Sequence, residues 1–165
     1  MSDEKNGMQV AETVSDELFM SEAIKEAALA AEMGEVPVGA VIVKNGEIIG
    51  RGRNTRENGK TALGHAEIMA IEQACAKLGG WRLMGCTMYV TMEPCPMCAG
   101  AVISARIPKV VSAVKDAKAG AFGSVLNVNS YPLNHKTEVT CGVMETEAVG
   151  LIGEFFARLR KKRMS

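Results

Sequence analysis

The sequence contains no apolar run approaching the roughly 20 residues that a membrane-spanning helix needs. Its amino terminus also lacks the basic and then apolar pattern of a secretory signal. Net charge is absent, since 19 basic residues balance 19 acidic ones, which argues against a surface that binds nucleic acid over its whole extent. The five cysteines are an odd number, which favours a reducing compartment over a disulfide framework. We therefore expect a cytoplasmic protein that has no membrane contact.

The length of 165 residues, 47% of them hydrophobic, is typical of a single domain. Residues 1–14 are polar and are predicted to be a disordered extension, so that residues 15–165 form the domain. Within the domain, the apolar pattern predicts an α/β protein in which strands and helices alternate. The expected helices are 15–33, one that starts at His65, one that starts at Cys95, and 144–162; the expected strands are 36–44, 47–52, 87–92, 109–114 and 137–141.

Two short motifs carry the chemistry, His65-Ala66-Glu67 and Pro94-Cys95-Pro96-Met97-Cys98. Catalytic zinc typically takes three protein ligands and leaves a fourth position to water. The imidazole of His65 and the thiolates of Cys95 and Cys98 meet that count. Glu67 is then free to take a proton from the attacking water and to return protons to the substrate and the leaving group. The motifs predict a hydrolytic zinc enzyme with one Zn²⁺ per chain.

The residues around these motifs predict that both lie at helix starts. A residue before proline avoids the helical region, and proline is tolerated at the first helical position, so Cys95 is expected to cap a helix that begins at Pro96. His65 and Glu67 are two residues apart, so both can face one metal only if His65 sits at or just before a helix start. The amino end of a helix also favours thiolates, the form of cysteine that binds metal.

Simpler explanations exist for each motif. Cys95 and Cys98 have the spacing of a redox-active pair, or they are two small core residues one helical turn apart. A lone histidine is more often structural than a ligand. Neither explanation accounts for Glu67 beside His65, so the combination of motifs is the specific signal.

The motifs resemble those of the TadA-type tRNA adenosine deaminases, which are members of the zinc-dependent cytidine and deoxycytidylate deaminase superfamily. The resemblance runs from Glu35 to Leu159, and its segments follow the family order: Glu35 to Ala40, His65 to Ile68, Tyr89 to Ala101, Ala105 to Ile107, Asp116 to Gly120, and Phe155-Phe156. It implies the cytidine-deaminase-like fold, a three-layer α/β/α sandwich with a five-stranded mixed sheet. The sequence departs from the family at Leu63-Gly64 and at Ser112-Ala113-Val114, which flank the site.

The resemblance implies that the wobble adenosine of a tRNA is hydrolysed to inosine. In the family, the residue that matches Asn54 contacts the target base, and the residues that match Asp116, Lys118, Asn134, Phe156 and Arg160 hold flanking nucleotides of the anticodon loop. Taken singly, each has a structural explanation; Asn54 can end a strand, Asp116 can cap a turn, and Phe156 can pack in the core. A loop suits such an enzyme because its bases are already unpaired.

Two other functions remain open on the sequence. A free-base deaminase for guanine or cytosine has no need of salt-sensitive RNA binding. A catalytically silent zinc subunit that binds RNA or completes an oligomer has no need of Glu67. The family resemblance also implies a homodimer. The small residues after Cys98 allow a second helix to approach closely or pack against their own sheet; they are Ala99, Gly100, Ala101, Ser104 and Ala105.

Overall fold

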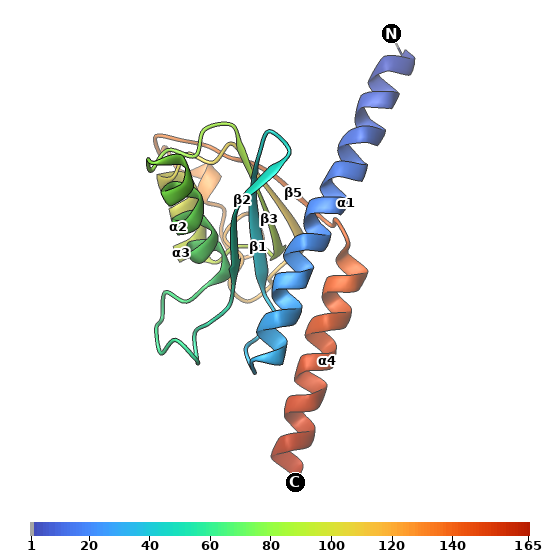
Figure 1. The fold of residues 1–165 in the computed structure, drawn as a ribbon, viewed down its shortest axis with the longest axis vertical. Coiled ribbons are helices and arrows are strands. Elements are labelled where there is room, and N and C mark those ends of the chain that lie inside the picture. The colour runs from blue at the N-terminus through green and yellow to red at the C-terminus, as the bar shows by residue number, and fades with distance from the viewer. Residues whose placement is uncertain (1) are drawn as a thin grey trace.

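A five-stranded mixed sheet lies at the centre of the computed structural model, which describes residues 2–165. The strand order is β2-β1-β3-β4-β5; β1 is antiparallel to both neighbours, whereas β3, β4 and β5 are parallel. The strands are β1 (Gly39–Lys44), β2 (Glu47–Arg53), β3 (Cys86–Met92), β4 (Lys109–Val114) and β5 (Glu138–Cys141), and the helices are α1 (Ser2–Glu32), α2 (Ala66–Leu78), α3 (Pro96–Ser104), the short 3-10 helix η1 (Val128–Ser130) and α4 (Glu145–Met164). In Figure 1, α2 and α3 cover one face of the sheet, and α1 and α4 lie on the other. The predicted three-layer fold is confirmed.

Each face of the sheet has its own hydrophobic core. Successive side chains of a strand point to opposite faces, and strand β3 shows this clearly. Met88 and Val90 join the core beneath α2 and α3, whereas Tyr89 between them joins the core beneath α1 and α4. Strand β1 alternates in the same way with Ile42 and Val41. The sheet is therefore buried on both faces, and its position relative to α2 and α3 is fixed by packing.

Helix α2 lies directly on strand β2, and the contact depends on glycine. A Cβ atom at Gly52 would lie 2.0 Å from the carbonyl oxygen of Ala66, and one at Gly50 would lie 2.3 Å from that of Ala70. The side chains of Ala66, Ala70 and Ala74 are fully buried in this contact. Small residues on both elements thus set the height of α2 above the sheet, and with it the position of His65 and Glu67.

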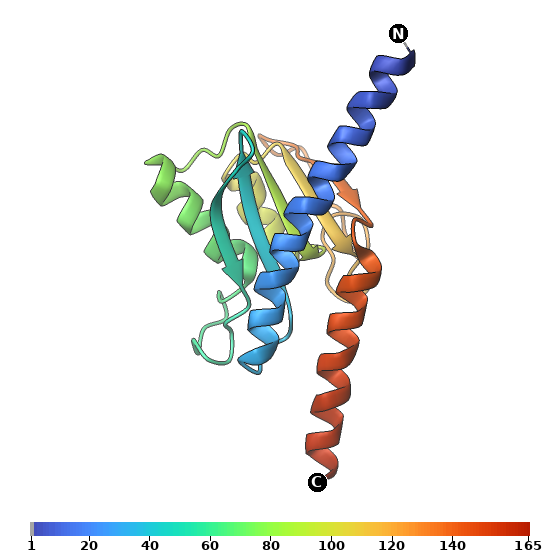
Figure 2. The same ribbon diagram turned by 45° about the vertical axis from the view of Figure 1, so that its right-hand side comes forward.

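The amino-terminal helix is longer than the sequence predicts. Helix α1 begins at Ser2 rather than at Ser15, so the described part of the segment predicted to be disordered is helical. Two contacts with the sheet explain part of this extension: Glu12 forms an ion pair with Lys109 at 2.6 Å, and the Tyr89 hydroxyl donates a hydrogen bond to Asp16 at 2.7 Å. The first turns of α1 project beyond the sheet (Figures 1 and 2).

Helix α4 also extends past the sheet, in the direction opposite to the start of α1 (Figure 2). Ala148 is its one buried residue in the described chain, because only the first turns of α4 have the sheet beneath them. The apolar side chains of this helix are therefore only partly covered, and Val149 and Phe156 stay 49% and 39% exposed. Among the described residues, no helix combines the length and apolar character needed to cross a membrane.

Candidate active site

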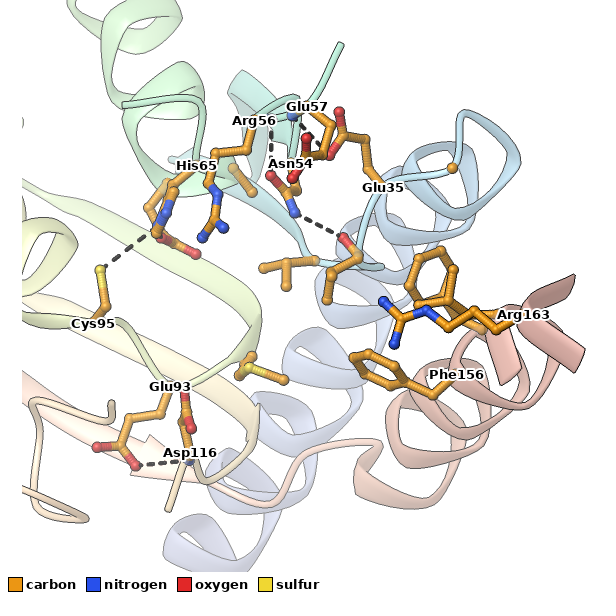
Figure 3. A pocket seen from close by; sticks show the side chains of 18 residues that line it. Glu35, Asn54, Arg56, Glu57, His65, Glu93, Cys95, Asp116, Phe156 and Arg163 are labelled. Carbon is orange, nitrogen blue, oxygen red and sulfur yellow. Dashed lines mark hydrogen bonds and ion pairs between the residues drawn. The ribbon is translucent and has the colours of Figure 1, made fainter. Parts of the chain in front are cut away.

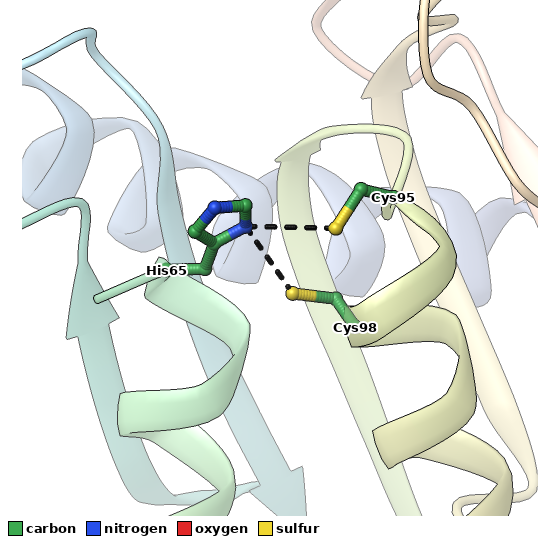
Figure 4. Close-up of side chains that lie close together, drawn as sticks. All are labelled: His65, Cys95 and Cys98. Atoms are coloured by element: carbon green, nitrogen blue, oxygen red, sulfur yellow. Dashed lines mark hydrogen bonds between the residues drawn. The ribbon is translucent and has the colours of Figure 1, made fainter. Parts of the chain in front are cut away.

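The two sequence motifs meet at the amino ends of α2 and α3 (Figure 4). His65 is the residue that caps α2, and Cys95 caps α3, with extended backbone at both positions. Pro96 is the first residue of α3, so Cys98 falls in its first turn. The predicted backbone at both motifs is confirmed.

The side chains of His65, Cys95 and Cys98 converge on one point. The Nδ1 atom of His65 lies 3.6 Å from Sγ of Cys95 and 3.5 Å from Sγ of Cys98, and all three candidate ligand atoms lie within 4.8 Å of one another. Cys98 is fully buried, whereas His65 and Cys95 are partly exposed toward a cavity. One nitrogen and two sulfur donors in this arrangement form a group that can hold a metal ion.

The two thiols differ in acidity although they are three residues apart. The hydrogen bond from Cys98 is the main cause that lowers the pKa of Cys95 to about 4, and the contact with His65 adds to it. The same hydrogen bond, together with burial, raises the pKa of Cys98 well above its ordinary value. The hydrogen bond to Cys95 also raises the pKa of His65. Cys95, at the amino end of α3, is therefore the more acidic of the two thiols.

Glu67 lies beside this cluster on the first turn of α2. Its side chain is almost completely buried, and its Oε2 atom lies 4.0 Å from Nδ1 of His65. Burial raises the pKa of Glu67 to about 7, even though the hydrogen bond with Cys98 acts in the opposite direction. A carboxyl group with such a pKa can both accept and donate a proton near neutral pH, which is the property of a general acid and base.

A cavity of about 420 Å³ opens onto the cluster and Glu67 (Figure 3). Its lining comes from the segment before β1, the loop after β2, the end of β3, the starts of α2 and α3, the loop after β4, and α4. The cavity is large enough to hold a small ligand and is enclosed by both apolar and charged groups. The lining residues are Gly34, Glu35, Val36, Val38, Asn54, Arg56, Glu57, His65, Ala66, Glu67, Met92, Glu93, Cys95, Asp116, Phe155, Phe156, Leu159 and Arg163.

Comparison with known proteins identifies the family. The sequence model of the MafB19-like deaminases matches residues 14–160. The tRNA-specific adenosine deaminase of Bacillus subtilis is 53% identical over 149 residues, which cover 90% of this chain and 92% of that protein. The chain belongs to the tRNA-specific adenosine deaminase family. A family member from Aquifex aeolicus is 46% identical over 145 residues, or 87% of this chain and 95% of that protein.

Solved structures agree with this assignment. A structure from a study of A-to-I editing by tRNA:A34 deaminases superimposes with a TM-score of 0.78 at 41% identity, covering 81% of this deaminase and 97% of that chain. The guanine deaminase of Nitrosomonas europaea is also similar, with a TM-score of 0.72 at 26% identity over 86% of this deaminase and 84% of that chain. The neighbours therefore share the deaminase fold and differ in the substrates that their names state.

The structure brings three of the six predicted RNA-contact residues of this deaminase to the cavity. Asn54, Asp116 and Phe156 line it. Lys118, Asn134 and Arg160 are exposed and lie outside its lining. Phe156 is not a core residue, as its 39% exposure shows, and its ring meets that of Phe155 edge-on at 5.3 Å.

Five charged residues of the lining are not among the site residues predicted from the sequence: Glu35, Arg56, Glu57, Glu93 and Arg163. Arg163 follows Phe156 by seven residues and Leu159 by four, so helical spacing places it on the same face of α4. This spacing could have indicated from the sequence that Arg163 lies on the same face as Phe156 and Leu159. Glu35 and Arg56 belong to a connecting segment and a loop, for which no periodicity exists.

The loop after β4 is held by a second buried carboxylate, Glu93. Its oxygens accept hydrogen bonds from the backbone N–H groups of Phe122 at 3.0 Å, Ser124 at 3.3 Å and Asp116 at 3.4 Å, and from the Ser124 hydroxyl. Burial alone would raise the pKa of Glu93, but these hydrogen bonds outweigh it and lower the pKa. Glu93 therefore fixes the loop that carries Asp116 to the cavity.

The two departures from the family pattern fit their surroundings. A Cβ atom at Gly64 would lie 3.0 Å from Oγ1 of Thr55 and 3.1 Å from the backbone nitrogen of Arg56, so glycine suits the close packing of this loop. Ser112 is buried in β4, and its hydroxyl donates to the carbonyl oxygen of Thr140 at 3.4 Å. Neither departure removes a group from the His65 and Glu67 side of the cavity.

Proposed function

We propose that this deaminase hydrolyses the wobble adenosine of a tRNA anticodon loop to inosine. The observation that carries the proposal is a buried carboxyl group, Glu67, next to a cluster of one imidazole and two thiols at the inner end of an open cavity. Family membership supports adenosine in tRNA as the substrate, because the relatives that share 43–53% of their residues with this chain are named tRNA-specific adenosine deaminases.

The residues present fit a zinc ion. Zn²⁺ in proteins is commonly bound by cysteine and histidine in tetrahedral geometry, and His65, Cys95 and Cys98 supply three such ligands. Both cysteines lie at the amino end of α3, and such a position favours the thiolate form that binds metal. When bound, Zn²⁺ would supply Lewis-acid activation of a water molecule at its open fourth position.

Glu67 moves the protons of the reaction. Deamination forms a bond from the water oxygen to C6 of adenine and breaks the bond from C6 to the amino nitrogen, which leaves as ammonia. Glu67 takes a proton from the attacking water, delivers one to N1 of the ring, and assists protonation of the leaving amino group. Its burial in the cavity wall keeps bulk water away from these transfers.

The rest of the cavity holds the looped RNA. We assign contact with the target base to Asn54, and contacts with flanking nucleotides to Asp116 and Phe156, since all three line the cavity. Lys118, Asn134 and Arg160 lie outside it and are assigned to RNA further along the loop. The exposed basic end of α4 suits phosphate groups, which position a nucleic acid without specifying its sequence.

We also propose that the enzyme is a cytoplasmic homodimer. Ala99 in α3 and Ala105 directly after it pack inside the chain, whereas Gly100, Ala101 and Ser104 are partly or fully exposed. This exposed side of small residues permits the close approach of a second helix. A single species of twice the chain mass in sedimentation equilibrium is expected; a monomer at micromolar concentration would contradict the dimer.

RNA binding tests the choice between tRNA and free-base deamination. With the zinc-loaded Glu67→Ala variant, we expect an anticodon stem-loop that contains a wobble adenosine to bind with an affinity that falls steeply as salt is raised. Metal analysis of the variant should match the wild type, because Glu67 is not a ligand. If the variant does not bind the stem-loop but binds free guanine or cytosine, the result would support a free-base deaminase instead.

A further inference from the structure

Glu35 is a buried carboxylate that has no cationic partner within ion-pair distance among residues 4–165. Its side chain is 1% exposed. Its oxygens instead accept three hydrogen bonds: from the backbone N–H of Asn58 at 2.7 Å, from the Asn58 side-chain amide at 2.8 Å, and from the backbone N–H of Glu57 at 3.2 Å. Burial alone would raise the pKa of Glu35, but the hydrogen bonds from Asn58 and Glu57 lower it. Glu35 is therefore held as an anion by the loop that follows β2.

That loop connects two parts of the proposed active site. It runs from Asn54 to Gly64, directly before His65, and its two ends are tied by a hydrogen bond from the Thr55 N–H to the Gly64 carbonyl at 2.9 Å. The side-chain amide of Asn58 also donates to the carbonyl of Met33 at 3.0 Å, so the loop is attached to the end of α1 as well.

The candidate base contact, Asn54, is oriented by the same region. Its side-chain amide donates to the carbonyl oxygen of Val36 at 3.2 Å, and its Oδ1 atom accepts from the backbone N–H of Arg56 at 3.1 Å. Figure 3 shows Glu35, Asn54, Arg56 and Glu57 gathered at one wall of the cavity. A change in the path of residues 56–58 would therefore move the support of Asn54.

We infer that Glu35 is a positioning residue, which fixes the 54–64 loop through Glu57 and Asn58 so that Asn54 and Arg56 face the substrate. The inference rests on the proposed function, since it assigns these residues to substrate contact. Glu35 acts through the loop and takes no part in bond making. Its loss should thus weaken substrate binding more than it slows the chemical step, for which Glu67 and the metal cluster remain in place.

Another buried glutamate, Glu26 of α1, provides a matched control. Glu26 is 9% exposed, pairs with Arg51 at 3.5 Å and with Arg53 at 3.3 Å, and does not line the cavity. Glu26→Gln alters a buried carboxylate whose ion-pair partners lie on β2, outside the loop. Any effect that Glu35→Gln shares with Glu26→Gln is a general effect on folding.

The experiment measures kcat and KM on an anticodon stem-loop for the zinc-loaded wild type and for the variants Glu35→Gln, Asn58→Ala and Glu26→Gln. In Glu35→Gln an amide NH₂ replaces one acceptor oxygen and faces N–H donors. We expect its KM to rise about tenfold with kcat within about twofold. Asn58→Ala alters an exposed residue and keeps Glu35, so it folds readily and should raise KM in the same direction. Glu26→Gln should lower Tm and leave KM unchanged.

Amide hydrogen exchange of the RNA-free variants adds a readout that does not depend on turnover. Faster exchange at residues 57 and 58 in Glu35→Gln, but not in Glu26→Gln, is expected. An active wild type with unchanged KM in both Glu35→Gln and Asn58→Ala would overturn the inference and leave the proposed function standing. A wild type that does not deaminate the stem-loop would refute the proposed function itself.

Discussion

Replacement of Phe156 by alanine should weaken RNA binding and leave the metal site intact. Phe156 lines the cavity from α4, and its ring is 39% exposed with only one edge-on aromatic neighbour, Phe155. Part of the Phe156 side chain is thus accessible to a nucleotide base. Stacking of a base on an aromatic side chain contributes about 1–3 kcal/mol by alanine substitution. Because Phe156 has a partly open ring, we expect about 1–2 kcal/mol, which raises Kd between about fivefold and thirtyfold.

The assay is equilibrium binding of the anticodon stem-loop to Phe156→Ala in the Glu67→Ala background, at several salt concentrations. Val149→Ala is the control, because Val149 is 49% exposed on the same helix and does not line the cavity. Arg163→Ala should lower the slope of log K against log salt by about 0.7, as expected for the loss of one phosphate contact to single-stranded RNA. Equal Kd values for Phe156→Ala and Val149→Ala would refute the assignment of this face of α4 to RNA.

Three further changes test other parts of the structure. Glu67→Gln should lower kcat by about 10²–10⁴ with unchanged zinc content, measured by single-turnover deamination and metal analysis; retained turnover would exclude Glu67 as the proton carrier. Gly52→Ala places a Cβ atom 2.0 Å from the carbonyl oxygen of Ala66, so it should lower the free energy of unfolding by about 1–3 kcal/mol and also reduce activity. Gly153→Ala is the control: a Cβ atom there meets no atom within 4 Å, so thermal unfolding should show no loss of stability. The folded state lowers the pKa of Glu35, so ionised Glu35 stabilises the fold at pH values above its ordinary pKa of 4.5. This stabilisation is lost as the pH falls through the lowered pKa of the folded state. The stability difference between wild type and Glu35→Gln in urea should therefore shrink in acid; a constant difference would contradict it.

Local sequence signals were enough to predict that His65, Cys95 and Cys98 lie together. Pro96 fixes the start of α3 at Cys95, and the two-residue spacing of His65 and Glu67 requires a helix start at His65; both predictions are confirmed. The alternation of strands and helices then brings the two helix starts together at one edge of the sheet. Such inferences succeed because each depends on the conformation of one or two adjacent residues.

The parts that the sequence did not predict depend on contacts between distant segments. The start of α1 at Ser2 is supported by Glu12 and Asp16, whose partners Lys109 and Tyr89 lie on strands far along the chain. Glu35 gains its role only when the 54–64 loop folds over it. No local pattern marks such a pairing.

Helix α4 shows what apolar periodicity in a sequence does not predict. An apolar stripe on α4 predicts that one face is covered, but it does not tell whether the covering surface is the protein or a ligand. In the structure Phe156 and Leu159 line the cavity together with Arg163, and Ala148 is the one buried residue of α4 within the described chain. Arg163 on the same face as Phe156 and Leu159 indicates a surface that borders the cavity rather than a core.

Product analysis by mass spectrometry tests the central claim most directly. Zinc-loaded protein and its Glu67→Ala variant are incubated with an anticodon stem-loop bearing a wobble adenosine, in a mixture with free guanine, cytosine and adenosine. We predict inosine at the wobble position of the RNA with the wild type, no product with the variant, and unchanged free compounds. Deamination of a free base alongside intact RNA would contradict the account and would show that the cavity selects a free nucleobase rather than a tRNA loop.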